Sequence, residues 1–173
     1  MVRGSPNPRY FGLPTRLRKA RKYAGLTRTA LAQRVGGDQT TALDIEVNQR
    51  LPTVGTIARL AIGLGVSAAW LGFGVGEMAA QDPLATCDGM GARLQAVRVG
   101  QGYSKAALAR LVKLSPTALA NIENGAQSGV EVIAGLAKAL QISPAWLAFN
   151  QGPQLLASRR RGRLPAQSSA PAG

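Results

Sequence analysis

Few side chains in this sequence could carry out covalent or metal chemistry. The chain contains no histidine and one cysteine, Cys87. A histidine-ligated metal site, a Cys/His or Ser/His catalytic pair and an internal disulfide are therefore excluded. We expect no enzymatic activity, no cofactor and no metal. A single cysteine is also typical of a protein that stays in a reducing compartment.

The charged residues offer a different kind of chemistry, attraction to a polyanion. The 173 residues include 21 Lys and Arg against 8 Asp and Glu, which gives a net charge of +13 at pH 7. An excess of this size indicates nucleic acid as a partner. Hydrophobic residues make up 46% of the chain, enough for folded cores, whereas aromatic residues at 5% leave few rings for base stacking.

Nothing in the sequence predicts a membrane or secreted protein. No apolar run approaches the roughly 20 residues needed to cross a bilayer. The N-terminal residues, with Pro6, Pro8 and Pro14 among arginines, lack the apolar core of a signal peptide. We therefore expect a cytoplasmic, nucleoid-associated protein.

The elements that must position these charges come in two copies. At a shift of 77, residues 17–46 overlie residues 94–123 and ten of thirty positions are identical. At a shift of 76, residues 53–74 overlie residues 129–150 and eleven of twenty-two are identical. We therefore predict five parts: a flexible basic arm (1–12), domain 1 (13–73), a linker (74–88), domain 2 (89–150) and a disordered basic tail (151–173).

Each copy is predicted to form five short helices. In the second copy, Ser104 is a candidate N-cap, and Ser115-Pro116 and Ser143-Pro144 are N-caps followed by proline at the first helical position. Apolar residues recur at three- and four-residue steps, and no stretch alternates with a period of two. The fold class is therefore all-α. In the first copy the helices are expected at about 14–24, 27–35, 39–47, 53–64 and 67–71.

The second and third helices of each copy are joined by only a few residues, which is typical of a helix-turn-helix. A Gly-Leu-Thr-Arg-x-x-Leu-Ala motif at 25–32 recurs as Gly-Tyr-Ser-Lys-x-x-Leu-Ala at 102–109. An Ile-Glu pair, an Ile-Ala-x-Leu-Ala helix and a Ser-x-x-Trp-Leu segment follow in order, at 45–46, 57–61 and 67–71 in the first copy and at 122–123, 133–137 and 143–147 in the second.

These motifs resemble the Cro and phage-repressor-like (xenobiotic response element, XRE) DNA-binding family, over about two thirds of the chain. The resemblance implies two tandem five-helix, lambda-repressor-like helix-turn-helix domains. It also implies sequence-specific binding of double-stranded DNA, usually by a transcriptional regulator and usually as a dimer. One departure is that Ala42 stands where the family buries a larger aliphatic residue, so we expect the third helix of the first copy to be held less firmly.

The third helix of such a domain inserts its N-terminal part into the major groove, where Gln and Asn can bond adenine with two hydrogen bonds. The residues that we expect to read bases are Gln39, Thr40, Thr41 and Asp44 in the first copy and Thr117 and Asn121 in the second. Those expected to anchor phosphates, by hydroxyl, backbone N–H or charge, are Thr27, Arg28, Arg50, Ser104, Lys105 and Lys113.

Two pairs of opposite charge recur at the same spacing. Arg21 and Glu46 are 25 residues apart, as are Arg98 and Glu123. In the family such a pair forms a salt bridge that fixes the third helix against the first, and we expect the same here. The basic tail and the arm, with the cations Arg3, Arg9, Arg16, Arg18 and Lys19, are expected either to track the DNA backbone or a minor groove or to be disordered solubilising ends.

The organisation of the whole regulator stays open at this point. We predict a transcriptional regulator, a repressor of bacterial or mobile-element origin, that binds DNA as a homodimer or spans two half-sites as an intramolecular pseudo-dimer. In the alternative, one repeat, the second, is a dimerisation module or docks a partner regulator and only the other reads DNA. Residues 1–76 carry a net charge of +8 and residues 93–150 carry +4, so the first copy attracts DNA more strongly.

Overall fold

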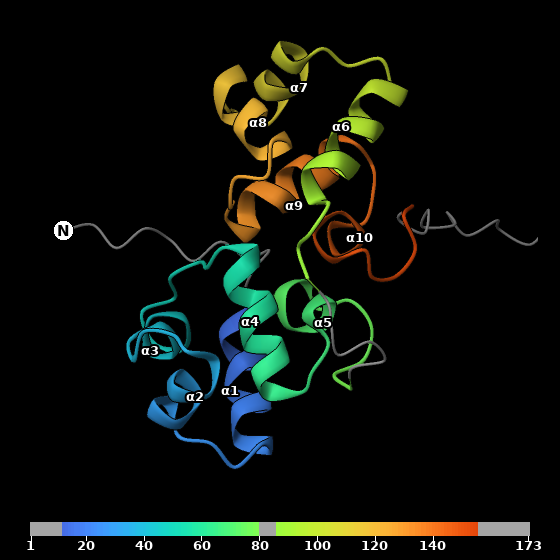
Figure 1. Ribbon diagram of the computed structural model, residues 1–173. Coiled ribbons are helices and arrows are strands. Elements are labelled where there is room, and N and C mark those ends of the chain that lie inside the picture. Colours follow the sequence, from blue (N-terminus) through green and yellow to red (C-terminus); the bar gives the residue numbers. More distant parts are fainter. Residues whose placement is uncertain (1–11, 80–85, 156–173) are drawn as a thin grey trace, which may run out of the picture.

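The computed structural model describes residues 12–79 and 86–155, and these residues form two helical domains (Figure 1). The first contains α1 (Leu13–Tyr23), α2 (Arg28–Val35), α3 (Thr41–Glu46), α4 (Val54–Leu64) and α5 (Ala68–Phe73). The second contains α6 (Met90–Gly100), α7 (Lys105–Leu111), α8 (Pro116–Glu123), α9 (Val130–Ala139) and α10 (Pro144–Phe149). The all-α fold class is confirmed, since no strand occurs within the described ranges.

Side-chain caps begin most of the helices. Thr27 accepts a hydrogen bond from the Ala30 N–H at the start of α2, and Ser104 accepts one from the Ala107 N–H at the start of α7. Thr53, Ser67, Ser115 and Ser143 cap α4, α5, α8 and α10 in the same way. Each cap accepts a hydrogen bond from a backbone N–H that has no partner within the helix, and so stabilises the helix by about 1 kcal/mol. The boundaries of the helices are therefore fixed locally.

The start of the third helix differs from the sequence prediction in the first copy. That helix was expected from residue 39, whereas α3 begins at Thr41 and spans six residues. The Asp38 carboxylate accepts hydrogen bonds from both the N–H and the hydroxyl of Thr40, at 2.8 and 2.9 Å, and so holds residues 38–40 in a turn. In the second copy Ser115 and Pro116 start the helix directly, and α8 spans eight residues.

Three of the cations that were expected to track DNA, Arg16, Arg18 and Lys19, lie on α1. Of these, Arg16 is half-buried. Its guanidinium donates hydrogen bonds to the carbonyl oxygens of Leu71 and Gly72, at 3.0 and 3.2 Å, and so covers the end of α5. A side chain that is half-buried in this way is not available to track DNA. The rest of the predicted arm, residues 1–11, and the predicted tail beyond residue 155 lie outside the described residues.

The two domains pack against each other and share one continuous apolar core. The α3–α4 connection of domain 1 lies beside the α8–α9 connection of domain 2, where the Val54 N–H donates to the Ser128 carbonyl (2.9 Å) and the Val130 N–H donates to the Pro52 carbonyl (3.1 Å). Helices α5 and α10 also meet, with the rings of Phe73 and Phe149 5.9 Å apart. Figure 1 shows α3 and α8 at the left of the molecule and α5 and α10 at the right.

Within the described ranges, no helix has both the length and the apolar character that a membrane span requires.

Candidate nucleic-acid interface

Each domain contains a helix-turn-helix, formed by α2 and α3 and by α7 and α8. The turn has the same backbone shape in both, because Gly36 and its equivalent Lys113 each have a φ of 59°. Glycine adopts this left-handed conformation freely, whereas a lysine there costs about 1 kcal/mol. The chain therefore keeps the turn in domain 2 at some cost in stability.

A buried ion pair holds α3 against α1. Arg21 donates to both carboxylate oxygens of Glu46, at 2.7 and 2.9 Å, and a third bond of 2.8 Å runs from Arg21 to the Leu26 carbonyl. Arg28 adds a bond to Glu46 from α2, with its Nε 3.0 Å from Oε2. The structure thus brings together three residues that the sequence singled out. Arg28, which was expected to contact a phosphate, uses one nitrogen of its guanidinium to bond Glu46.

The equivalent pair in domain 2 has fewer partners. Arg98 donates to both oxygens of Glu123, at 2.5 and 3.2 Å, and to the Tyr103 carbonyl at 2.8 Å. The Lys105 ammonium lies 3.7 Å from Glu123 Oε2, close enough for charge attraction but too far for a hydrogen bond. Glu123 therefore depends on Arg98 more than Glu46 depends on Arg21.

The Glu46 carboxylate stays charged inside the protein. Its burial acts to raise the pKa, but the hydrogen bonds and charges of Arg21 and Arg28 outweigh burial and hold the pKa below its ordinary value of 4.5. The same contact with Glu46 raises the pKa of Arg21. Both members of the pair are therefore ionised at neutral pH.

Arg16 and Arg93 have an equivalent structural role that the sequence did not predict, since Arg16 was expected to track DNA and Arg93 was not singled out. They are equivalent at the shift of 77, and Arg93 donates to the carbonyls of Leu147 and Ala148, both at 3.0 Å, as Arg16 does to those of Leu71 and Gly72. Burial lowers the pKa of both arginines. The aligned stretch began at residue 17, so extending it by one residue would have revealed the pair.

The exposed surface before and along α3 carries the base-reading candidates of domain 1. Gln39 and Thr40 are exposed in the turn, and Thr41 is half-buried at the start of the helix. Asp44 accepts hydrogen bonds from Asn48 (2.8 Å) and Arg50 (3.3 Å). The candidate base contact Asp44 and the candidate phosphate contact Arg50 thus bond to each other, which offsets the negative charge of Asp44 on this surface.

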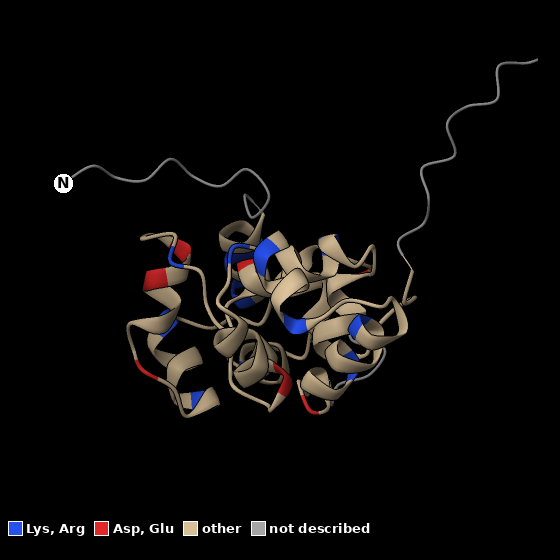
Figure 2. Ribbon diagram, turned by 90° about the horizontal axis from the view of Figure 1, so that it is seen from above, with Lys and Arg blue, Asp and Glu red and all other residues tan. Residues whose placement is uncertain are grey.

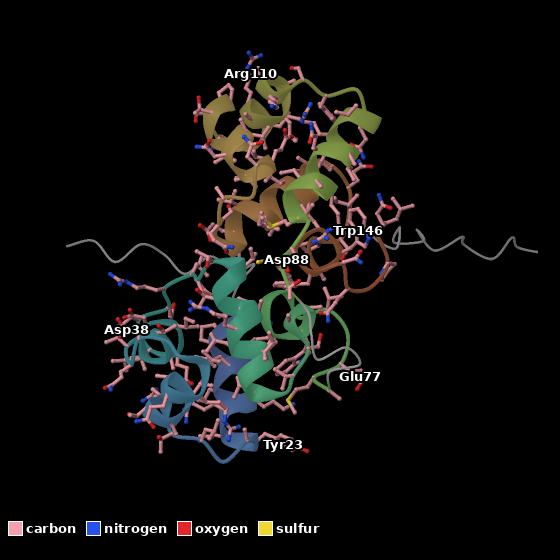
Figure 3. The ribbon with its side chains drawn as sticks, viewed as in Figure 1. Tyr23, Asp38, Glu77, Asp88, Arg110 and Trp146 are labelled. Carbon is pink, nitrogen blue, oxygen red and sulfur yellow. The ribbon has the colours of Figure 1, made fainter. Side chains whose placement is uncertain are left out.

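The equivalent surface of α8 is polar but uncharged at its start. Thr117 and Asn121 are exposed one helical turn apart, and Pro116 occupies the position equivalent to Gln39. Three exposed cations, Lys105, Arg110 and Lys113, lie on α7 and the turn that follows it. Arg110 projects from the outer end of domain 2 in Figure 3, and Figure 2 shows the charged residues of both domains along the ribbon.

The packing behind the two reading helices differs. Ala42 on α3 is buried beside a small pocket that is lined by residues of α2, α3 and α4, among them Leu31, Val35 and Leu60. Its equivalent on α8 is Leu119, which is fully buried. The shorter side chain thus leaves space in domain 1 that a leucine fills in domain 2.

Neither tryptophan belongs to the reading surfaces. Trp70 on α5 and Trp146 on α10 are half-buried and pack against the core. Figure 3 places Trp146 beside α10, on the side of the molecule away from α8. Both rings pack as expected of core residues.

The fold and the repeated surface define a tandem helix-turn-helix protein. The family described as Helix-turn-helix (HTH_3), of the Cro and phage-repressor (XRE) type, matches residues 17–71 and again residues 94–147, and the chain belongs to this family. Its domains are DNA-binding regulatory domains. No curated protein and no solved structure matches the chain.

Proposed function

We propose that this chain is a sequence-specific regulator of transcription that reads double-stranded DNA with α3 and α8 in successive major grooves. One observation carries the proposal: in both domains an exposed polar surface lies at the start of a helix that a buried Arg–Glu pair fixes to the rest of its domain. Rigid support of this kind is what base recognition requires, since hydrogen bonds to base edges tolerate little displacement.

In domain 1, Gln39 is the main base-reading residue, through two hydrogen bonds to an adenine. Thr41 offers a hydroxyl and a methyl group to neighbouring bases, and Thr40 offers its methyl group and an accepting hydroxyl oxygen, since its hydroxyl proton is donated to Asp38. Asp44 keeps Arg50 at the edge of the surface, where the side chain of Arg50 is 76% exposed and can reach a phosphate. Asp44 thus acts on DNA mainly through Arg50.

In domain 2, Asn121 reads an adenine and Thr117 contacts the base pair beside it. The half-site of α8 has fewer base contacts than that of α3, because Pro116 stands where domain 1 has Gln39. Domain 2 compensates with charge, since Lys105 and Lys113 are exposed on either side of its helix-turn-helix. The unfavourable backbone conformation of Lys113 supports a functional reason for a lysine there.

Phosphate contacts orient each domain on the duplex. Thr27 and Arg28 begin α2, and Ser104 and Lys105 begin α7, with the two hydroxyls already committed to capping. A phosphate there meets the exposed parts of Arg28 and Lys105, whose side chains are 38% and 47% exposed. Repression follows when such a complex covers promoter DNA.

A second candidate function keeps DNA reading in domain 1 and makes α8 a docking surface for a partner regulator. Apolar exposure in domain 2 favours it, because Leu111 at the end of α7 is 59% exposed and Pro116 at the start of α8 is also exposed. Under this alternative, Asn121 contacts no base.

Selection from a library of random duplexes, followed by DNase footprinting upstream of the chain's own gene, tests the proposal. We expect a discrete enriched motif and a protected site at about 0.15 M salt with excess competitor DNA. Binding that enriches no sequence and only fades as salt rises contradicts the proposal and leaves a general polyanion binder. Repression is tested by a reporter fused to the protected site, whose output should fall when the protein is supplied.

A further inference from the structure

The contact between the two domains is made by equivalent parts of each. Residues 52–54 of domain 1 and 128–130 of domain 2 are related by the shift of 76. They form an antiparallel bridge centred on Thr53 and Gly129, which are themselves equivalent. The two hydrogen bonds across it are reciprocal, because Val54 donates to Ser128 and the equivalent Val130 donates to Pro52.

The apolar part of the contact obeys the same relation. The facing rings belong to Phe73 and Phe149, which occupy equivalent positions at the ends of α5 and α10. A Cβ added at Gly72 on α5 would lie 3.6 Å from the Phe149 ring, in ordinary van der Waals contact with α10. A face on which each residue meets its own equivalent is the mark of a two-fold interface, as found between the identical subunits of a dimer.

Two further hydrogen bonds between the domains have no symmetry-related equivalent and make the contact specific for domain 1 paired with domain 2. The Gln127 side-chain oxygen accepts from the Gly55 N–H (3.1 Å), and that of Gln151 accepts from the Ala69 N–H (3.0 Å). The equivalents of these two glutamines are Leu51 and Val75, which cannot make such bonds. A pair of domain 1 copies would lack both glutamines, and a pair of domain 2 copies would place the Cβ of Glu131 where Gly55 leaves room for the Gln127 amide. The contact therefore fits domain 1 to domain 2 better than either domain to a copy of itself.

We propose that one chain is a complete DNA-reading unit. Its two domains pair with each other through the two-fold face, so a single chain covers one operator of two half-sites. This inference rests on the proposed function. The two half-sites differ in sequence, because α3 reads with Gln39 where α8 has Pro116. The operator is thus an imperfect palindrome with half-sites about 10 base pairs apart, and the chain binds it in one orientation.

A disulfide across the bridge tests the pairing. Thr53 and Gly129 face each other as a non-hydrogen-bonded pair of the antiparallel bridge. The Cα atoms of such a pair are typically about 4.5 Å apart, which is within the range that a disulfide spans. The variant carries Thr53→Cys and Gly129→Cys, with Cys87→Ser to remove the native thiol. The atoms nearest to a new side chain at residue 129 belong to the far end of the flexible Glu131 side chain, which must shift to admit it.

Mild oxidation should close this disulfide within one chain. We expect a species of monomer mass, 18.0 kDa, that loses both free thiols and migrates faster in a non-reducing gel. The two single-cysteine variants, also in the Cys87→Ser chain, serve as controls and should form no such species. Cross-linked dimers of the double variant, or two thiols that stay free while the chain is folded, would overturn the pairing.

The number of chains on DNA tests the inference in the wild-type chain. Native mass spectrometry of the wild-type chain on a duplex with one selected site should give one chain per duplex, and the oxidised variant should bind that duplex with an unchanged dissociation constant. Two wild-type chains per site, or binding by the reduced variant that oxidation abolishes, would overturn the inference. If selection yields no motif, the proposed function fails, whereas the disulfide result still decides whether the domains pair.

Discussion

Loss of the arginine from the buried ion pair should cost more stability in domain 2 than in domain 1. The two perturbations are Arg98→Met and Arg21→Met, which remove the charge and keep a long apolar side chain. They are closely matched, because each arginine also donates one 2.8 Å bond to a backbone carbonyl, that of Tyr103 or Leu26. The difference between the variants therefore reports on what else holds the carboxylate.

The structure sets the size of that difference. Breaking a buried pair by removing one partner costs about 4 kcal/mol, and this is the expected loss for Arg98→Met, since Lys105 is 3.7 Å from Glu123 and about half-exposed. After Arg21→Met, the Arg28 bond of 3.0 Å to Glu46 remains. A charge-assisted bond contributes about 1.5 kcal/mol, and about 1 kcal/mol after allowance for the 38% exposure of Arg28. Arg21→Met should thus cost about 3 kcal/mol.

Urea unfolding of each single variant, followed by far-UV circular dichroism, measures both losses. A dependence of the free energy of unfolding on urea concentration that equals that of the wild type checks two-state behaviour. Arg28→Ala added to Arg21→Met should remove the difference between the domains. Equal losses for the two single variants, or a larger loss for Arg21→Met, would refute the argument that Arg28 supports Glu46.

Two further predictions concern backbone strain and acid. Lys113→Gly should raise the free energy of unfolding by about 1 kcal/mol, because glycine adopts the left-handed conformation of this turn freely. The same variant should bind DNA with a salt dependence that is lower by about one phosphate contact. A variant that is stabilised but keeps the wild-type salt dependence would argue against a phosphate contact by Lys113. The pKa of Glu46 is depressed by folding, so its contribution to stability is present above its ordinary value of 4.5 and is lost as pH falls through the folded value. In urea titrations at a series of pH values below 4.5, the free energy of unfolding of Glu46→Gln should fall less steeply with decreasing pH than that of the wild type. An unchanged pH dependence would show that Glu46 is not the source of this loss of stability.

Much of the fold could be predicted from the sequence, because its signals are local and occur twice. Caps such as Thr27 and Ser104 mark helix starts through one side-chain bond to the backbone three residues on. The repeat then carries each signal from the copy where it is clear to the copy where it is weak. The Arg–Glu pairs could be proposed through the family resemblance at their common spacing of 25 residues, and the structure joins the two residues in both domains.

Other features leave little trace in the sequence. The start of α3 depends on how the Asp38 carboxylate turns back to Thr40, and a capping aspartate and a helical one look alike in sequence. The left-handed turn of domain 2 uses Lys113 where domain 1 uses Gly36, so the glycine signal is lost while the backbone shape stays. The bridge between domains joins backbone groups, which every residue except proline can supply.

The most direct test of the central claim, that both domains of the chain read bases, is the dissociation constant of the selected duplex at about 0.15 M salt for Gln39→Ala, Asn121→Ala and the double variant. Each removed pair of base contacts is worth about 1–3 kcal/mol, so each single variant should bind about 5- to 150-fold more weakly, and the free-energy losses should add in the double variant. Gln95→Ala, exposed on α6 and outside both helix-turn-helix motifs, should bind like the wild type. An unchanged dissociation constant for Asn121→Ala, with a loss for Gln39→Ala, would contradict the claim and leave domain 1 as the only reader of the sequence.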